Sequence, residues 1–300
     1  MIDIIYLNDG MLITYAWGIC QEGHMNKLDK LRQVQVVAAL VEGASINSVV
    51  RMTGVSKPTI LKLLADLGIA CAKYQDEKLR GLPCKRIQAD EIWSFCFAKD
   101  KNLSEEMQGK FGFGSIWTWT AICADTKLMI SWLVGDRSVP YAVKFIDDLA
   151  SRLAHRVQLT TDGHKPYLRA VEGAFGSEID YAVLEKIYTA NPQEGTTTRY
   201  SPAKCCGTVT HRIAGNPESE HISTSYAERM NLQIRMDMRR FTRLTNAHSK
   251  KVANHRHALA LYFMYYNFAR IHSTLRVTPA MQAGVSDHVW SIGEIVGLLS

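Results

Sequence analysis

Three acidic residues, Asp90, Asp162 and Glu228, lie in sequence surroundings that suit carboxylates binding a divalent metal ion. Asp90 lies in a β-rich stretch, Asp162 ends a short apolar run, and Glu228 lies near the start of a predicted helix. Functional groups gather outside the carboxyl ends of strands in an open α/β sheet, so acids on three such elements can meet. Carboxylate oxygens are the ligands that Mg²⁺ prefers, and two such ions about 3.5–4 Å apart activate an attacking oxygen and stabilise a leaving one.

Each of these acids also has an ordinary structural interpretation, and the residue pattern alone leaves both open. Glu91 follows Asp90 and points to the opposite face of a strand, so periodicity favours Asp90 only weakly. Asp162 within Thr-Asp-Gly-His fits a turn, where Gly163 allows the backbone to turn and a substrate to approach closely. Glu228 forms Ser-x-x-Glu with the serine three positions before it, which is the pattern of a helix-capping box.

The elements that must position the acids follow from hydrophobic periodicity. Three strands predict a meander, and a helix, a short buried strand, a second helix and a fifth strand follow. A helix starting at Thr224 or Ser225 and a last apolar helix close the pattern. The predicted strands cover 87–98, 115–125, 127–136, 157–162 and 179–188, and the predicted helices cover 140–154, 165–175 and 253–268. The fold class is therefore α/β, in the ribonuclease H-like arrangement of a mixed sheet covered by helices. Residues 189–223 are rich in Gly, Pro, Thr and Ser, which predicts an irregular insertion.

A small all-α unit precedes the strands. Residues 28–42 place apolar side chains at helical spacing: Leu28, Leu31, Val34, Ala38 and Val41. Ser45 can cap a helix over 46–53, Gly54 supplies a turn, and Ser56 can cap a third helix that Gly68 ends after residue 67. This is the helix-turn-helix pattern, and the third helix offers a small basic and hydroxylated face to a DNA major groove. A plain packing module is the alternative interpretation.

Charge is unevenly distributed along the 300 residues, which carry a net charge of +6. The segment 229–276 holds ten Lys and Arg against one acid, Asp237. A localised basic region indicates a polyanionic partner, most simply nucleic acid, although a solvated basic helix has the same composition. The seven cysteines form no Cys-x-x-Cys pair, which favours a reducing cytosol over a disulfide framework.

Three segments resemble the catalytic motifs of DDE transposases, and their residues are most similar to those of the founding bacterial insertion-sequence family. They are Ala-Asp-Glu-Ile-Trp (89–93), Thr-Thr-Asp-Gly-His (160–164) and Ala-Glu-Arg-Met-Asn-Leu (227–232). The stretches 239–251 and 265–276 strengthen the match, which covers roughly residues 28–300. By this resemblance Asp90, Asp162 and Glu228 are the catalytic, metal-binding triad, with Mg²⁺ as cofactor and Mn²⁺ as a substitute.

The spacing departs from that of many retroviral-type integrases. The three acids are 72 and 66 positions apart (162 − 90 and 228 − 162), and the long second gap is assigned to the insertion 189–223. Four other glutamates remain weaker alternatives to Glu228: Glu185, Glu194, Glu218 and Glu220. The family's N-terminal zinc-finger cysteines are absent from this sequence, so recognition of transposon ends must rest on the helix-turn-helix.

The resemblance implies an enzyme that cleaves DNA at the terminal inverted repeats of a bacterial mobile element and joins the freed 3′-hydroxyl to target DNA. Its expected partners are double-stranded DNA and further copies of itself, because two ends must be brought together. No membrane is involved, and the expected location is the bacterial cytoplasm, at the nucleoid. The expected DNA contacts are Ser56, Lys57, Thr59, Lys62, His164, Lys165, Arg229, Asn231, Arg235, Arg239 and Arg243.

The expected domains follow from these assignments. They are an extension (1–24), a helix-turn-helix domain (25–70), a linker (71–84), a catalytic domain (85–276, with the insertion 189–223) and a C-terminal tail (277–300). Two alternatives remain: a ribonuclease H-like nuclease without strand transfer, and a helix-turn-helix regulator whose second domain is catalytically inactive.

Overall fold

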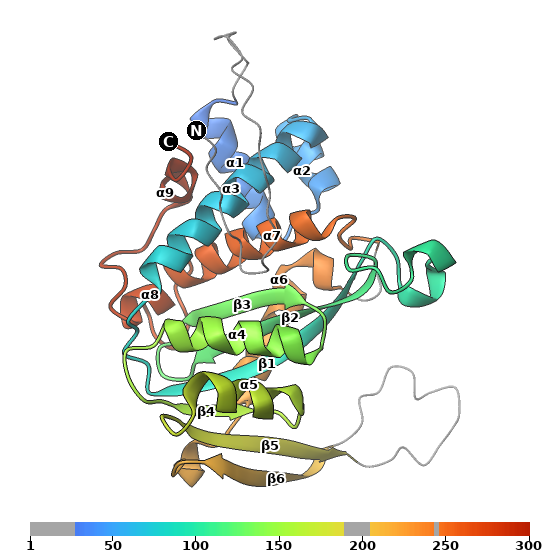
Figure 1. Cartoon of the computed structure of the whole chain (residues 1–300). Coiled ribbons are helices and arrows are strands. Elements are labelled where there is room, and N and C mark those ends of the chain that lie inside the picture. The colour runs from blue at the N-terminus through green and yellow to red at the C-terminus, as the bar shows by residue number, and fades with distance from the viewer. Residues whose placement is uncertain (1–27, 189–204, 243–245) are drawn as a thin grey trace, which may run out of the picture.

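The computed structural model describes residues 28–188, 205–242 and 246–300. The predicted extension (1–24), part of the predicted insertion and Arg243 lie outside the described residues. A mixed six-stranded sheet forms the centre of the molecule, with helices on both of its faces and a helical layer at one end (Figure 1). The predicted α/β class, a mixed sheet flanked by helices, is therefore confirmed.

The strand order of the sheet is β3-β2-β1-β4-β5-β6. Strands β1, β2 and β3 form the predicted antiparallel meander, whereas β4 and β5 run parallel to β1 and β6 runs antiparallel to β5. The strands are β1 (Arg86–Cys96), β2 (Gly114–Cys123), β3 (Met129–Gly135), β4 (Gln158–Thr161), β5 (Asp180–Tyr188) and β6 (Cys205–Ala214). The two parallel strands β1 and β4 lie side by side in the middle, where helices cover both faces.

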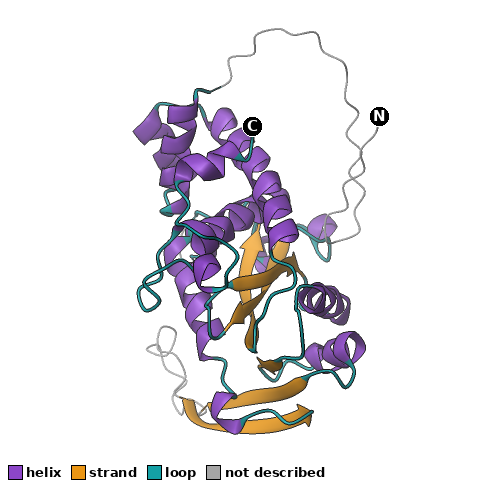
Figure 2. Ribbon diagram, turned by 90° about the vertical axis from the view of Figure 1, so that its left-hand side faces the viewer, coloured by secondary structure: helices purple, strands orange, loops and turns teal. Residues whose placement is uncertain are grey.

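Successive side chains of β1 point alternately to the two layers of helices. Ala89 faces the core with α4 (Val139–Ser151) and α5 (Pro166–Phe175), whereas Ile92 packs with α6 (Ser225–Asp237). Because successive side chains of a strand point to opposite faces, Asp90 faces the α6 layer and Glu91 faces the α4–α5 layer. The two layers appear on opposite sides of the sheet when the molecule is turned (Figure 2).

Strand β6 corrects the prediction that 189–223 is irregular. Cys205–Ala214 forms an edge strand that pairs with β5 along its length. Nearly all of its residues are exposed, so it lacks the alternation of apolar and polar residues by which a half-buried strand is found. Its strand character lies in its β-branched residues, such as Thr208, Val209 and Thr210.

The N-terminal helices are α1 (Lys30–Val41), α2 (Ile46–Thr53) and α3 (Lys57–Lys78). The predicted caps are confirmed, because Ser45 accepts a hydrogen bond from the Ser48 amide and Gly54 adopts a left-handed conformation. The buried face of α1 differs from the predicted one, since Leu31 is exposed and Val36 and Val37 are buried.

Helix α3 does not end at Gly68, as the sequence predicts, but runs on to Lys78, so much of the predicted linker 71–84 is helical. Gly68 instead allows α3 to pack closely against α7 (Val252–Met264), where a Cβ atom would lie 2.4 Å from that of His257. In the sequence alone, a glycine that is required for close packing of two helices cannot be distinguished from a glycine that ends a helix.

The C-terminal residues pack back on the N-terminal helices. Helix α7 continues into a π-helical turn, Tyr265–Ala269, whose buried Asn267 pairs with the backbone of Met129 on β3 in both directions at 2.9 Å. The predicted tail contains α8 (Pro279–Gln282) and α9 (Ile292–Gly297), and α9 contacts α1 and α3. No helix within the described ranges is long and apolar enough to cross a membrane.

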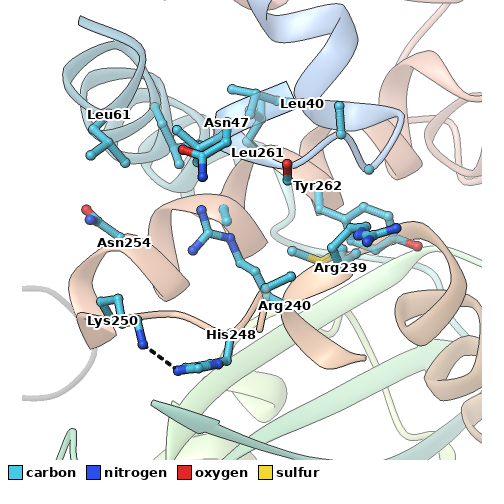
Figure 3. Close-up of a pocket in the computed structure, with 18 of the residues that line it drawn as sticks. Leu40, Asn47, Leu61, Arg239, Arg240, His248, Lys250, Asn254, Leu261 and Tyr262 are labelled. Carbon is cyan, nitrogen blue, oxygen red and sulfur yellow. Dashed lines mark hydrogen bonds between the residues drawn. The ribbon is translucent and has the colours of Figure 1, made fainter. Parts of the chain in front are cut away.

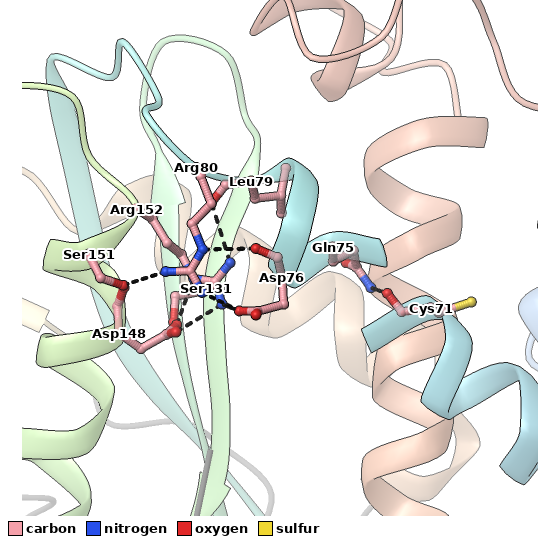
Figure 4. Close-up of polar contacts among 9 residues, drawn as sticks. All are labelled: Cys71, Gln75, Asp76, Leu79, Arg80, Ser131, Asp148, Ser151 and Arg152. Carbon is pink, nitrogen blue, oxygen red and sulfur yellow. Dashed lines mark hydrogen bonds and ion pairs between the residues drawn. The ribbon is translucent and has the colours of Figure 1, made fainter. Parts of the chain in front are cut away.

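A buried arginine joins the helical layer to the sheet. Arg152, 5% exposed, donates to Asp76 of α3 at 2.8 Å and to Asp148 of α4 at 2.7 and 2.9 Å (Figure 4). Asp148 also accepts from Ser131 of β3. Arg80 lies beside this network and bonds to Asp76 and Ser151, but it is exposed.

We expect Arg152→Ala to lower the free energy of unfolding by roughly 2–4 kcal/mol, because it leaves the largely buried Asp148 carboxylate without its cation. The matched control Arg80→Ala removes an exposed ion pair to the same Asp76 and should cost no more than about 1 kcal/mol. Urea unfolding of both variants measures the difference. Equal losses in the two variants would show that the buried network does not join the layers.

Candidate active site

The register between β1 and β4 brings Asp90 and Asp162 together. Ala89 pairs with Thr161 in this parallel ladder, so Asp90 on β1 lies beside Asp162, the residue that directly follows β4. Oxygen atoms of Asp90, Glu91 and Asp162 lie within 4.8 Å of one another. Two of the three predicted triad members therefore meet at the carboxyl end of β4, and the neighbour of Asp90 joins them from the opposite face.

Asp90 is held by two hydrogen bonds. It accepts from the Glu91 amide at 2.7 Å and from Nδ2 of Asn231, on α6, at 2.8 Å. The pKa of Asp90 is raised to about 7, mainly by burial and also by the negative charges of Asp162 and Glu228, while the hydrogen bond from the Glu91 amide and the charge of Arg137 oppose the rise. Asp90 is therefore partly protonated at neutral pH until a cation compensates its charge.

Glu91 is a site residue that the sequence analysis assigns no role. Its side chain is fully buried, and its pKa is raised to about 8, first by burial and then by Asp162, while Tyr167 and Arg137 oppose the rise. Its Oε1 atom has no partner with hydrogen-bond geometry, so the carboxyl group is only half satisfied. The sequence does contain the adjacent acids Asp90 and Glu91. Because successive side chains of a strand point to opposite faces, however, only one of the two is expected on the same face as the other site residues.

Arg137, in the loop between β3 and α4, is the cation of the site. Its guanidinium lies 3.1 Å from Glu91 and 3.5 Å from Asp162, and it stacks over the Trp117 ring with 4.7 Å to the centroid. Nothing in its local sequence marks it, because its partners lie on β1 and after β4. It places one positive charge between two carboxylates that would otherwise repel each other.

Glu228 is positioned by β1 but lies outside the 4.8 Å group. Its Oε1 accepts from Thr224 at 2.6 Å, and its Oε2 pairs with Lys186 of β5. The side chain of the buried Gln88 accepts from the first amides of α6, those of Tyr226 (2.7 Å) and Ala227 (3.2 Å). These contacts take the place of the capping box with Ser225 that the sequence offers as an alternative, and they fix α6 against β1.

The predicted DNA contacts fall into two groups. The four on the first turns of α3 are exposed: Ser56, Lys57, Thr59 and Lys62. Near the carboxylates, Lys165 and Arg229 are exposed, whereas Asn231 is half-buried and donates to Asp90. Arg239 does not share a helix face with Glu228, because α6 ends at Asp237 and Met238 is extended and buried.

His164 and Gly163 both lie in close contact with neighbouring parts of the fold. The His164 ring packs against Trp119 at 5.7 Å and Tyr167 at 6.0 Å, and burial lowers its pKa, so it is neutral at pH 7. Its amide donates to Asp162 at 3.0 Å, which forms a tight turn. A Cβ at Gly163 would lie 2.9 Å from the side chain of Glu185, so this glycine makes room for β5.

The donor set fits a divalent cation. Hard cations of the Mg²⁺ type prefer carboxylate oxygens, and Asp90, Glu91 and Asp162 offer several within a short span. The unpartnered Oε1 of Glu91 and the raised pKa values of Asp90 and Glu91 show that one guanidinium does not satisfy these acids.

Comparison with known proteins gives weak likenesses. No protein-family profile and no curated protein matches the chain. Among solved structures, the piggyBac transposase synaptic complex with hairpin DNA is similar with TM-score 0.41 and 11% identity, over 90% of this chain and 70% of that one. The Mos1 strand transfer complex (TM-score 0.22, 13% identity) and a pre-cleavage Mos1 transpososome (0.23, 11%) are matched over 54% and 55% of this chain. The chain spans 61% and 63% of those two proteins. Likenesses of this size carry no argument about activity.

The raised carboxyl pKa values predict how stability depends on pH. A carboxyl group whose pKa rises on folding, from about 4 to about 7 at Asp90, contributes fully below pH ~4 and loses that contribution as pH climbs towards 8. We expect metal-free Asp90→Asn to match wild type near pH 4 and to exceed it by roughly 1–3 kcal/mol at pH 8. Thermal or urea unfolding across this range measures the difference.

Asp147→Asn, at an exposed position of α4, is the control and should give no such pH trend. If the difference between Asp90→Asn and wild type stays constant from pH 4 to pH 8, Asp90 is not held in the repulsive environment described here.

Proposed function

We propose that the chain is a DDE-type DNA transposase of a bacterial insertion sequence, which cleaves DNA at transposon ends and transfers the freed strand to target DNA. The observation that carries this proposal is the meeting of Asp90 and Asp162 on neighbouring parallel strands. Helix α6, which bears Glu228, is tied to the same place because Asn231 donates to Asp90. Three carboxylates from three elements suit metal-dependent phosphodiester chemistry.

The sheet supports the assignment to the ribonuclease H-like class. A meander of three antiparallel strands is followed by two strands parallel to the first, with α4 and α5 as the crossover helices on one face. Short turns and right-handed crossovers limit the ways in which such a chain can form one sheet. The additional strand β6 continues the sheet beyond β5.

Asp90, Asp162 and Glu228 would hold Mg²⁺ or Mn²⁺, and the bound ions supply a deprotonated water at neutral pH and charge stabilisation for the leaving oxygen. Gln88 and Asn231 position α6 and Asp90. Arg137 compensates part of the charge of Glu91 and Asp162 in the apo protein and would also be available to a phosphodiester oxygen. No side chain has to form a covalent bond to DNA in this scheme.

The DNA partners are the terminal inverted repeats and the target duplex. We assign end recognition to the helix-turn-helix of 25–70, through Ser56, Lys57, Thr59 and Lys62, which are exposed at the start of α3. Lys165 and Arg229 are close in sequence to Asp162 and Glu228, and we assign both, together with Arg235 of α6, to the cleaved strand. Bringing two ends together requires a homo-oligomer, and the protein would act in the bacterial cytoplasm, at the nucleoid.

We expect Asp162→Asn to reduce cleavage of inverted-repeat DNA more than about 100-fold, since losing even an outer-sphere partner of a metal site costs 10–100-fold. DNA binding in EDTA should stay nearly unchanged, because the exposed face of α3 is not altered. Gel analysis of labelled DNA in Mg²⁺ and in Mn²⁺ measures cleavage, and the melting temperature controls for folding. Wild-type cleavage by this variant would show that Asp162 is not a catalytic residue, whereas DNA binding without any cleavage by the wild type would favour the inactive DNA-binding regulator. Cleavage without joining in wild type would favour the nuclease.

The two glutamates near Asp90 can be distinguished. If Glu228 completes the triad, Glu228→Gln should abolish cleavage and weaken Mn²⁺ binding, whereas Glu91→Gln should leave Mn²⁺ binding within a few-fold of wild type. Glu91→Gln keeps the shape of a side chain that supports Arg137, so its cleavage should fall by less than about 100-fold. Mn²⁺ affinity by electron paramagnetic resonance is the readout. The reverse order of the two variants would assign the third carboxylate to Glu91.

A further inference from the structure

A second concave site lies away from the carboxylates, between the helical layer and the segment that follows α6. It is a pocket of about 540 Å³, with the α1–α2 turn and the start of α3 on one side and residues 238–240 and 246–251 on the other (Figure 3). Leu61 and Leu261 form an apolar part of its wall, and the amide side chains of Asn47 and Asn254 also line it. Its size is that of a ligand site rather than of a packing defect.

The charge of this pocket has one sign. Five cationic side chains line it: Lys57, Arg239, Arg240, Lys250 and Lys251. No aspartate or glutamate is among the lining residues. The nearby acids are engaged elsewhere, since Glu42 accepts from Tyr265 at 2.8 Å and Asp237 binds Arg270 and Tyr262. Within the part of the chain that the structure describes, none of the five cations forms an ion pair with a carboxylate.

Arg240 is the cation of this pocket whose surroundings are best defined. It projects into the pocket (Figure 3), and its guanidinium donates to the Ser249 hydroxyl at 2.9 Å. Burial lowers the pKa of Arg240 to about 10, so it stays charged at pH 7 although it is poorly solvated. Arg240 is half-buried, and a partly desolvated cation without a counter-ion lowers the stability of the folded state, so an anion in the pocket would compensate it. The planar guanidinium fork suits a phosphate oxygen pair.

We propose that this pocket binds a backbone phosphate of the DNA strand, as an anchor separate from the carboxylate site. The proposal rests on DNA being the substrate of the chain. Cys96, at the end of β1, pairs with Ser249 beside the pocket, and Cys96 lies six positions after Asp90 on this strand. This spacing corresponds to about 20 Å. Successive phosphates of one strand are about 3.4 Å apart along the axis of a B-form duplex, so the anchored phosphate would lie several nucleotides from the reacting one.

Cations on opposite walls favour a strand over a compact acidic surface. Lys57 comes from α3, whereas Lys250 and Lys251 come from the segment before α7, so an occupant must enter between them. A phosphodiester strand is narrow enough to do so and carries its charge at regular intervals. The site also explains why Lys57 and the basic segment, far apart in sequence, face one cavity.

Lysine footprinting on the full-length protein tests the location. We expect saturating duplex DNA in EDTA to slow acetylation of Lys57, Lys250 and Lys251 several-fold, measured by mass spectrometry. Lys73 on the same helix α3 lies outside the pocket and is 72% exposed, so it should react at the same rate with and without DNA. Equal rates at Lys250 in the two conditions would overturn the proposal.

Salt titration of DNA binding tests the energetics. Lys250→Gln and Arg240→Gln should each flatten the slope of log Kd against log salt by about one unit, as for one lost phosphate contact, whereas Lys73→Gln should not. Lys250 is exposed, so its variant remains informative if Arg240→Gln folds poorly. A wild type that binds DNA, with an unchanged slope in Lys250→Gln, overturns the pocket alone. A wild type that does not bind DNA overturns the proposed function as well.

Discussion

Repulsion between two like charges on neighbouring strands is the constraint around which this protein is organised. The parallel register of β1 and β4 puts Asp90 and Asp162 side by side, and burial strengthens their repulsion because little water is present to screen it. A sheet whose strands are covered on both faces can hold Asp90 on β1 and Asp162 directly after β4 at short range, because the strands leave the backbone little freedom to move apart. The stability of the remaining core offsets the cost of keeping these groups together.

The surrounding contacts hold the acids in place but leave part of their negative charge uncompensated. Asn231 and the Glu91 amide fix Asp90, while Gln88 fixes the start of α6. Arg137 compensates part of the charge from the side, and Oε1 of Glu91 remains unsatisfied. Lys186 holds Glu228 in a similar way. The apo site is therefore partly neutralised by side chains of the protein itself, and a metal ion would compete with them.

Much of this arrangement can be predicted from the sequence, because it depends on local patterns. The strand that carries Asp90 is rich in β-forming residues and the strand that precedes Asp162 is a short apolar run, and Ser45 and Gly54 give direct helix signals. Features that depend on contacts between distant segments could not be predicted. Gly68 reads as a helix end until α7 is seen to pack on it, and Arg137 becomes notable only through partners on other strands. Strand β6 lacks a buried face, so its pattern contains no alternation.

The central claim is that Asp90 and Asp162 share a divalent metal ion, and anomalous scattering from crystals soaked in Mn²⁺ tests it most directly. The account predicts a peak about 2.1 Å from one carboxylate oxygen of each aspartate, with the Arg137 guanidinium moved away from Asp162. The peak should disappear in Asp162→Asn crystals soaked in the same way. A map with no manganese between these aspartates, or with manganese bound only by other residues, would contradict the account.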